Sequence, residues 1–260
     1  MGADVLASRA GFEAQWAALR AWVDTVPADA WGRPCVLEGW TVTDLVLHLT
    51  RGIELLARIE PAEPGAVPLS IAQYVGAYPG AAAAIAEGTR ALAADLGDDV
   101  TGALDASWSR TVEGLDGWGS DGRRVVSALR GPIRLDDMVL TRTLELVVHG
   151  DDLARSVPEV EPPVHDRGAL RDVVKLLLGV LAERAPGHTV EVRVPPFAAV
   201  QCIEGASHTR GTPPNTVETD PLTWVRVACG RVPWSEAVHD GTVRASGTRA
   251  PDLAPHLPLL

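Results

Sequence analysis

The sequence predicts an α+β protein made of an N-terminal helical bundle, residues 1–157, and a smaller C-terminal α+β domain, residues 163–260. Apolar residues recur at helical spacing through about the first 155 residues, whereas later segments alternate between apolar and polar residues, as strands do. Pro158, Pro162 and Pro163 lie between the two patterns. Because closely spaced prolines end helices, this cluster predicts a linker between the two domains.

Two helices are predicted at the start of the bundle. Residues 3–25 carry apolar side chains at helical spacing, and the pattern stops before Pro27. Residues 41–59 form the second predicted helix. Thr41 is a suitable N-cap for it, and Asp44 stands at the third helical position, where an acidic side chain completes a capping box.

The rest of the bundle is predicted as two further helices joined by a loop. Residues 70–97 are rich in alanine, and the helix predicted there is interrupted near Pro79. The glycine-rich segment EGLDGWGSDGRR, residues 113–124, predicts a loop. The fourth long helix is predicted over residues 135–156.

The C-terminal domain is predicted to mix helices and strands. Its first element is a helix near residues 165–185 with the apolar run VVKLLLGVLA, and Asp220 with Pro221 predicts the N-cap and first position of another. A short helix is expected near residues 234–239. Alternating segments predict four strands, at residues 189–194, 198–203, 215–219 and 242–246.

Charge and composition exclude several classes of protein. The formal net charge of −11 argues against a nucleic-acid-binding surface, because phosphate binding needs clustered lysine and arginine. The sequence has no apolar run long enough for a transmembrane helix and no secretory signal. Its three cysteines are scattered and form no CxxC pair, which predicts reduced thiols in a cytoplasmic protein.

The segment LTRTLELVVHGDDLA, residues 140–154, predicts a buried pair of titratable side chains. Glu145 and His149 are four residues apart, so on a helix they share one face about 6 Å apart along the axis. Their neighbours are apolar nearly all round, and a buried carboxylate needs a charged partner. A metal ion would be such a partner. Asp152 could then orient the His149 imidazole, and Arg142 extends the same stripe. The alternative is a Glu/His pair on the helix surface.

The segment GWTVTDLVLHLTRG, residues 39–52, offers a third ligand. His48 stands among leucine and valine residues, and Gly52 leaves space beside it on the same face. A core histidine with an ordinary hydrogen-bond partner is the alternative interpretation. Together with Glu145 and His149, however, His48 completes a set of two imidazoles and one carboxylate, which suits zinc or another divalent ion with an open coordination position.

Other motifs favour no particular chemistry. The spacing of GWGSDG fits neither a phosphate-binding nor a dinucleotide-binding loop, and no Gly-x-Ser-x-Gly motif is present. The remaining histidines are expected in loops or at the surface, namely His165, His188, His208, His239 and His256.

These motifs resemble a known family. GWTVTDL with its following HL, and RTLELVVHGDDLA, resemble the DinB-like metal-binding N-terminal domain of mycothiol-dependent maleylpyruvate isomerases. The segment DPLTWVRVACGRVPWSEAVHDGTVRASG, residues 220–247, resembles the sterol-carrier-like C-terminal domain of the same family, so the resemblance covers nearly the whole chain in the right order. It implies an up-down helical bundle, zinc bound by His48, Glu145 and His149, and mycothiol as cofactor. It also implies a cytoplasmic location.

The resemblance further implies a catalytic arginine in the C-terminal domain, for which Arg226 and Arg231 are both candidates. Arg142 and Asp152 are the candidate cofactor-binding residues beside the metal. The expected partners are a low-molecular-weight thiol and a small molecule, with neither nucleic acid nor membrane.

The expected reaction follows from a thiol held by the metal. Its thiolate would add to an activated double bond, and rotation followed by loss of the thiolate would isomerise the substrate. An S-transferase would retain the adduct instead. An acidic substrate would need arginines, and the candidates between the glycine-rich loop and the fourth helix are Arg123, Arg124, Arg130 and Arg134, unless these are only solvated surface residues.

Two functions without catalysis stay open. The first is a small-molecule or lipid-binding protein in which the metal site is structural, and the second is a regulatory or resistance protein that sequesters a small molecule. A fourth metal position blocked by a side chain would favour binding, whereas an open position facing a cleft would favour the enzyme.

Overall fold

The computed structural model describes residues 5–78, 85–91, 99–205 and 214–260, which divide into two compact units, Met1–Ala169 and Leu170–Leu260. Helices dominate the first unit, and the second combines helices with a four-stranded sheet. The predicted α+β class, with a helical N-terminal part and a sheet-containing C-terminal part, is therefore confirmed. The boundaries at residues 157 and 163 stay a prediction.

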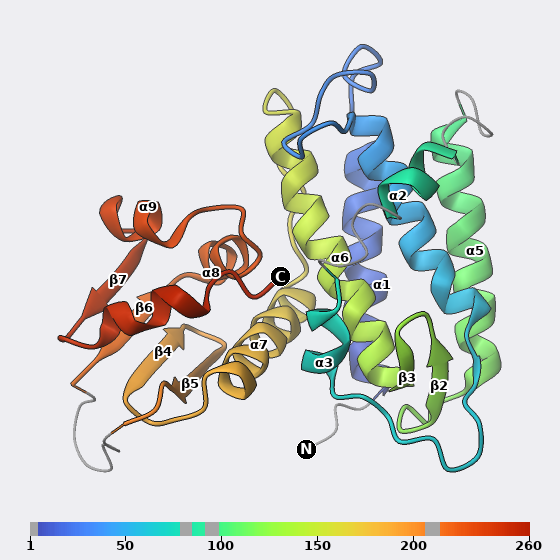
Figure 1. Cartoon of the computed structure of the whole chain (residues 1–260). Helices are drawn as coiled ribbons and strands as arrows, with labels where there is room; N and C mark the ends of the chain where they lie inside the picture. Colours follow the sequence, from blue (N-terminus) through green and yellow to red (C-terminus); the bar gives the residue numbers. More distant parts are fainter. Residues whose placement is uncertain (1–4, 79–84, 92–98, 206–213) are drawn as a thin grey trace. The chain divides into compact units, whose positions relative to one another are not determined.

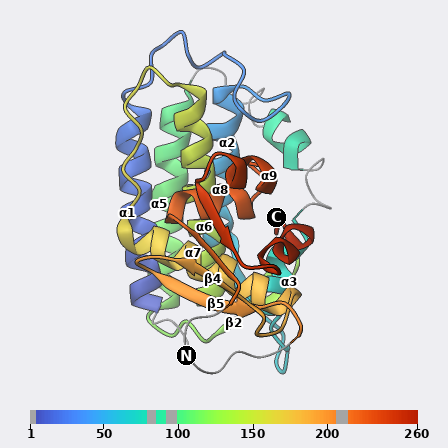
Figure 2. The same cartoon turned by 90° about the vertical axis from the view of Figure 1, so that its left-hand side faces the viewer.

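Four long helices form the bundle of the first unit and run alongside one another, as Figures 1 and 2 show. α1 packs on α6, and α2 packs on both α5 and α6. Their shared core includes Phe12, Trp16, Leu45, Leu49 and Leu146. The bounds of these helices are α1 (Val5–Val23), α2 (Val42–Glu54), α5 (Val100–Trp118) and α6 (Leu135–Ser156).

The loop predicted at residues 113–124 is wrong for its first half, because α5 continues to Trp118. Gly114 marks a close contact: a Cβ atom on it would lie 2.8 Å from Cα of Ala57, which follows α2. Glycine at this position therefore lets α5 approach the chain after α2 and does not break the helix. The helix ends at Gly119, whose φ of 68° lies in the left-handed region that glycine adopts easily.

A small antiparallel sheet beside the bundle was not predicted. It consists of β1 (Glu60–Pro61), β2 (Val125–Ala128) and β3 (Gly131–Arg134). Ala128 pairs with Gly131, so Leu129 and Arg130 form the two-residue turn of a hairpin. The hairpin thereby places these two side chains next to the bundle.

The predicted alanine-rich helix is only partly described. The short helix α3 (Ile71–Gly76) begins at a capping box formed by Ser70 and Gln73, and residues 85–91 are helical. The interruption near Pro79 and the alanine run 81–84 lie outside the described residues. One turn of 3₁₀ helix, η1 (Leu55–Arg58), extends α2.

The second unit matches its predicted elements closely. Its sheet has the order β5-β4-β6-β7, in which β4 and β6 are parallel and the other neighbours are antiparallel. The predicted cap is confirmed, because the Asp220 carboxylate accepts hydrogen bonds from the N–H groups of Leu222 and Thr223. The elements are α7 (Arg167–Arg184), β4 (Val190–Val194), β5 (Ala198–Cys202), β6 (Thr216–Thr219), α8 (Pro221–Ala228), α9 (Trp234–His239), β7 (Val243–Ser246) and the unpredicted η3 (Ala250–His256).

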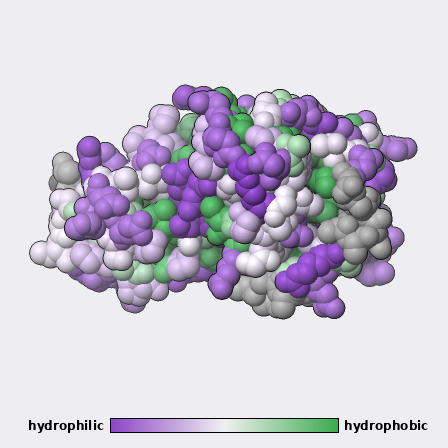
Figure 3. Space-filling model, turned by 90° about the horizontal axis from the view of Figure 1, so that it is seen from above, coloured by the Kyte–Doolittle hydropathy of each residue, from purple (hydrophilic) through white to green (hydrophobic). Residues whose placement is uncertain are grey.

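The surface in Figure 3 is mostly hydrophilic, with apolar residues scattered in small groups. None of the helices in the described ranges has the length and hydropathy that crossing a membrane requires. All three cysteines are free, with Cys202 and Cys229 buried and Cys35 half-buried.

Candidate metal centre

His48 is positioned by the way α2 begins. Thr41 caps the helix by accepting a hydrogen bond from the N–H of Asp44, and the Asp44 carboxylate accepts one from the N–H of Thr41. This reciprocal capping box, which the sequence predicts, fixes the start of the helix. The apolar face of α2 is then buried in the bundle, and His48 lies beside it with only 14% of its side chain exposed.

Glu145 and His149 project from α6 toward His48. Oε2 of Glu145 lies 3.1 Å from Nε2 of His48 and 3.3 Å from Nε2 of His149. One ligand atom from each of the three residues lies within 4.8 Å of the others, in the arrangement that a metal ion requires. The two imidazole rings are perpendicular, with centroids 4.8 Å apart. The structure therefore brings together the three side chains that the sequence selects.

Asp152 orients the His149 ring. Its fully buried carboxylate lies 2.9 Å from Nδ1 of His149, so this nitrogen is the protonated one and donates a hydrogen bond to Asp152. In the neutral ring Nε2 is then an acceptor, and it faces the Glu145 carboxylate, which is also an acceptor. Two acceptors at 3.3 Å need a cation between them, either a proton or a metal ion. The cluster is therefore suited to a divalent ion.

The pKa values of the cluster show how its charges are balanced. Burial disfavours the ionised form of Glu145, but hydrogen bonds with His149 and His48 outweigh burial and hold its pKa well below the usual value. Burial also acts on His149, yet Asp152 and Glu145 together raise its pKa. For His48 burial prevails over Glu145, and its pKa is lowered. Of the two histidines, His149 is therefore the one whose surroundings favour the protonated form.

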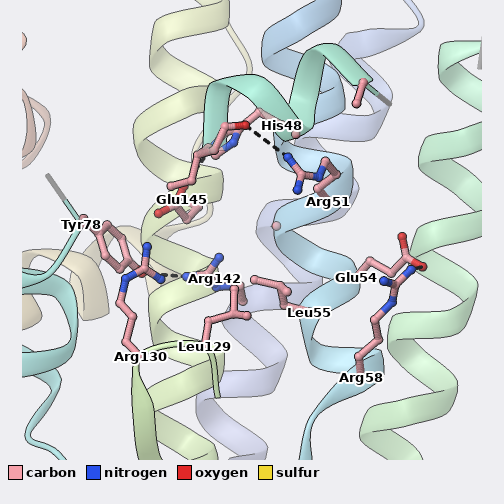
Figure 4. Close-up of a pocket in the computed structure, with 14 residues that line it drawn as sticks. His48, Arg51, Glu54, Leu55, Arg58, Tyr78, Leu129, Arg130, Arg142 and Glu145 are labelled. Atoms are coloured by element: carbon pink, nitrogen blue, oxygen red, sulfur yellow. Dashed lines mark hydrogen bonds and ion pairs between the residues drawn. The ribbon is translucent and has the colours of Figure 1, made fainter. Parts of the chain in front are cut away.

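A cavity of about 400 Å³ opens beside the cluster, and His48 and Glu145 form part of its wall (Figure 4). Four arginines also line it, Arg51, Arg58, Arg130 and Arg142. Arg142 is buried, and its Nη2 donates a hydrogen bond of 2.7 Å to the hydroxyl of Tyr78. The site thus joins two imidazoles and a carboxylate to a strongly basic pocket.

Of the arginines that the sequence suggests for binding an acidic substrate, some line the cavity and others do not. Arg130, at the tip of the hairpin, lines the cavity. Arg123, Arg124 and Arg134 are exposed and do not line it. Arg226 lies in the last turn of α8, and Arg231 follows the same helix and donates to the carbonyl of Cys229, so both belong to the second unit. Their catalytic role stays a prediction.

The other histidines in the described ranges do not belong to the cluster. His188 and His239 are exposed, His165 and His256 are half-buried, and His208 lies outside the described residues. Nδ1 of His165 lies 3.2 Å from the amide nitrogen of Gln15.

Several cavity residues were not identified from the sequence, among them Arg51 and Tyr78. Arg51 is three residues after His48, so helical spacing could have placed it beside the histidine. Tyr78 follows a short helix and carries no periodic signal.

Both units of the chain are similar to known proteins. The family model described as mycothiol maleylpyruvate isomerase N-terminal domain matches residues 12–154, and that of a bacterial SCP ortholog matches residues 166–259. A crystal structure of a mycothiol-dependent maleylpyruvate isomerase is similar, with a TM-score of 0.58, 15% identity and coverage of 88% of each chain. A point mutant of such an isomerase gives a TM-score of 0.59 at 15% identity, over 93% of this chain and 91% of that one. No protein with curated annotation matches.

Proposed function

The chain belongs to the mycothiol maleylpyruvate isomerase family, and we propose that it is a metal-dependent enzyme that acts on a small, acidic electrophile with mycothiol as its thiol. The convergence of His48, Glu145 and His149 beside an arginine-lined cavity is the observation that carries this proposal. Isomerisation is the first candidate reaction, and S-transfer is the second because it begins with the same attack by a thiolate.

The proposed metal is zinc or another divalent ion. Two imidazoles and one carboxylate match a catalytic zinc site that keeps one position for a non-protein ligand. Bound there, the ion would stabilise the thiolate form of a thiol, and the thiolate is the nucleophile that both candidate reactions need. His48, Glu145 and His149 would hold the ion, and Asp152 would keep the His149 ring turned so that Nε2 faces it.

The chain's arginines would hold the acidic substrate. Arg130 and Arg142 reach the cavity from the first unit, and the guanidinium group is the side chain best suited to a carboxylate. Arg226 and Arg231 remain candidates for a catalytic role from the second unit. A basic cavity would allow a protein of net charge −11 to accept an anion.

The cavity favours an enzyme over a binding protein with a structural metal. A structural site would be closed by a fourth protein ligand, whereas among the described residues only three side chains form the cluster and two of them line the cavity. Substrate would thus have access to the metal.

The direct test is turnover of maleylpyruvate by the zinc-loaded full chain with added mycothiol. Isomerisation predicts a trans product with the thiol recovered, whereas S-transfer of an electrophile predicts thiol consumed in proportion to product. Glu145→Gln, which removes the ligand charge with little change in volume, should abolish either activity. Turnover at the same rate without thiol would reject the thiol-dependent mechanism, and full activity of the Glu145 variant would reject the metal.

A further inference from the structure

Tyr78 holds two guanidinium groups on one wall of the cavity (Figure 4). Its hydroxyl accepts the hydrogen bond from Nη2 of Arg142, and the Arg130 guanidinium lies over its ring, 4.4 Å from the centroid. Arg130 comes from the hairpin tip and Arg142 from α6, so separate parts of the fold converge here. Two like charges brought together in this way are unfavourable unless an anion compensates them.

Neither guanidinium forms a close ion pair with a carboxylate among the described residues, and Glu145 attracts Arg142 only from a longer distance. Arg58 differs in this respect. Arg58 lines the same cavity, but its Nη2 pairs with Glu54 at 2.7 Å. The hydrogen bonds of Arg142 go to uncharged groups, the hydroxyls of Tyr78 and Thr141. Since arginine has five N–H groups, Arg142 keeps donors for a ligand. The pair is therefore available to an anion, whereas Arg58 already pairs with Glu54, a carboxylate that it shares with Arg110.

Arg51 has a different role. Its guanidinium donates to the carbonyl of Ile85 and to the hydroxyl of Thr89 in the helical residues 85–91. A Cβ atom on Gly88 would lie 2.4 Å from Nη2 of Arg51, so glycine is what allows this contact. Arg51 consequently fastens these residues over the cavity.

A second hollow, of about 370 Å³, adjoins the main cavity, and Glu60 and Ser127 are the polar residues that only it contains. It shares Leu55, Arg58 and Leu129 with the main cavity. Ile59, Ala128 and Met138 add further apolar surface. Leu129 is 75% exposed at the hairpin tip, although large apolar side chains are usually covered. An apolar ligand group on this surface would cover it.

We propose that Arg130 and Arg142, held by Tyr78, bind the carboxylate of an amphipathic substrate whose hydrocarbon part lies along Leu55 and Leu129. The substrate class is thus a carboxylic acid with an apolar extension, larger than a compact dicarboxylate. The reaction of this substrate depends on the proposed function, whereas its binding at the arginines does not. Arg130 and Tyr78 are specificity and positioning residues in it.

The test measures equilibrium binding of octanoate and butyrate to the full chain by calorimetry, without thiol, before and after chelation of metal. Octanoate should bind at least tenfold more tightly than butyrate, because four added methylene groups become partly buried. Both carboxylates should still bind after chelation, since the arginines and not the metal hold them. Equal affinities for the two acids, or binding that disappears on chelation, would overturn the proposal.

Matched variants separate the charge from the apolar surface. Arg130→Gln should weaken the binding of both acids about tenfold, and Tyr78→Phe should weaken it less. Arg124→Gln, at an exposed position that does not line the cavity, should change neither affinity by more than about twofold. Leu129→Ser should weaken octanoate but not butyrate, and Val67→Ser, at another exposed apolar position, should affect neither. Wild-type affinity in Arg130→Gln would contradict carboxylate binding by Arg130 and Arg142. The binding measurement needs no turnover. A protein that binds the acids as expected but shows no activity with mycothiol would therefore reject only the proposed function.

Discussion

Helices α6 and α7 are both long and rich in leucine and valine, yet they bury different kinds of residue. Every fully buried side chain described in α7 is apolar, including Val173, Leu177 and Leu181. In α6 charged side chains are buried too, among them Asp136, Arg142 and Asp152. Because burying a charge is unfavourable, the polar residues of α6 need compensation that α7 does not.

The difference separates a helix that only builds a core from a helix that builds a core and also carries a site. In α6 the compensation comes from Tyr78 for Arg142 and from His149 for Asp152, and a divalent ion would complete it for Glu145. Changes in α7 should therefore affect stability alone, whereas changes in α6 can also affect ligand binding. The following predictions test this division.

The largest expected effect is on stability, from Leu177→Ala in α7. Leu177 is fully buried, and removing such a side chain costs about 2–5 kcal/mol of unfolding free energy. Denaturant unfolding should show this loss, while zinc affinity measured by chelator competition should stay within about twofold of wild type. A large fall in zinc affinity would mean that the two helices do not divide their roles as proposed.

Asp152→Asn tests whether Asp152 of α6 orients the His149 ring for metal binding. The asparagine amide no longer offers a carboxylate to Nδ1 of His149, so the ring loses its preferred tautomer. Loss of such a partner lowers metal affinity about 10- to 100-fold. Chelator competition should show this decrease, whereas Asp240→Asn at an exposed position of the second unit serves as the control. Equal affinity in both variants would assign Asp152 a structural role alone.

Adding zinc should reverse the pH dependence of the contribution that His149 makes to the free energy of unfolding. In the metal-free protein the raised pKa of His149 stabilises the fold below the histidine's usual pKa of about 6.5, and this contribution is lost as pH rises through the folded value. The lowered pKa of Glu145 has the opposite sign, since its contribution is present above about 4.5 and is lost on acidification. With zinc bound, protons compete with the ion, so affinity should fall about tenfold per pH unit below the pKa of His149. Thermal unfolding against pH with and without zinc would measure both trends. Parallel curves would show that zinc does not bind at this cluster.

The smallest expected effect comes from Thr41→Ala, which removes the N-cap of α2. Loss of a side-chain cap costs about 1 kcal/mol. Thr41→Ser should restore most of it, because serine keeps the hydroxyl that accepts from Asp44. Denaturant unfolding of the two variants gives the comparison, and equal stability of Ala and Ser would show that the cap is not what fixes the helix start.

The sequence predicts the metal cluster well because its residues lie on regular helices. Glu145 and His149 follow from helical spacing, and the resemblance to a family adds His48. The loop prediction at residues 113–124 was partly wrong because Gly114 allows close packing of α5. This packing is visible only in the structure, where Gly114 contacts Ala57. The hairpin that presents Arg130 is short and lies between helices, and Tyr78 meets Arg142 only through the tertiary fold. Contacts between segments far apart in the chain have no local signal.

The central claim is that His48, Glu145 and His149 bind one divalent ion with an open position. Zinc content and X-ray absorption of the purified full chain test it most directly, with Glu145→Gln as the matched variant. The account predicts one zinc per chain with two imidazole nitrogens at about 2.0–2.1 Å, a carboxylate oxygen and a non-protein ligand, and a large loss of zinc in the variant. A wild-type chain that holds no metal, or a variant that holds it equally well, would contradict the account.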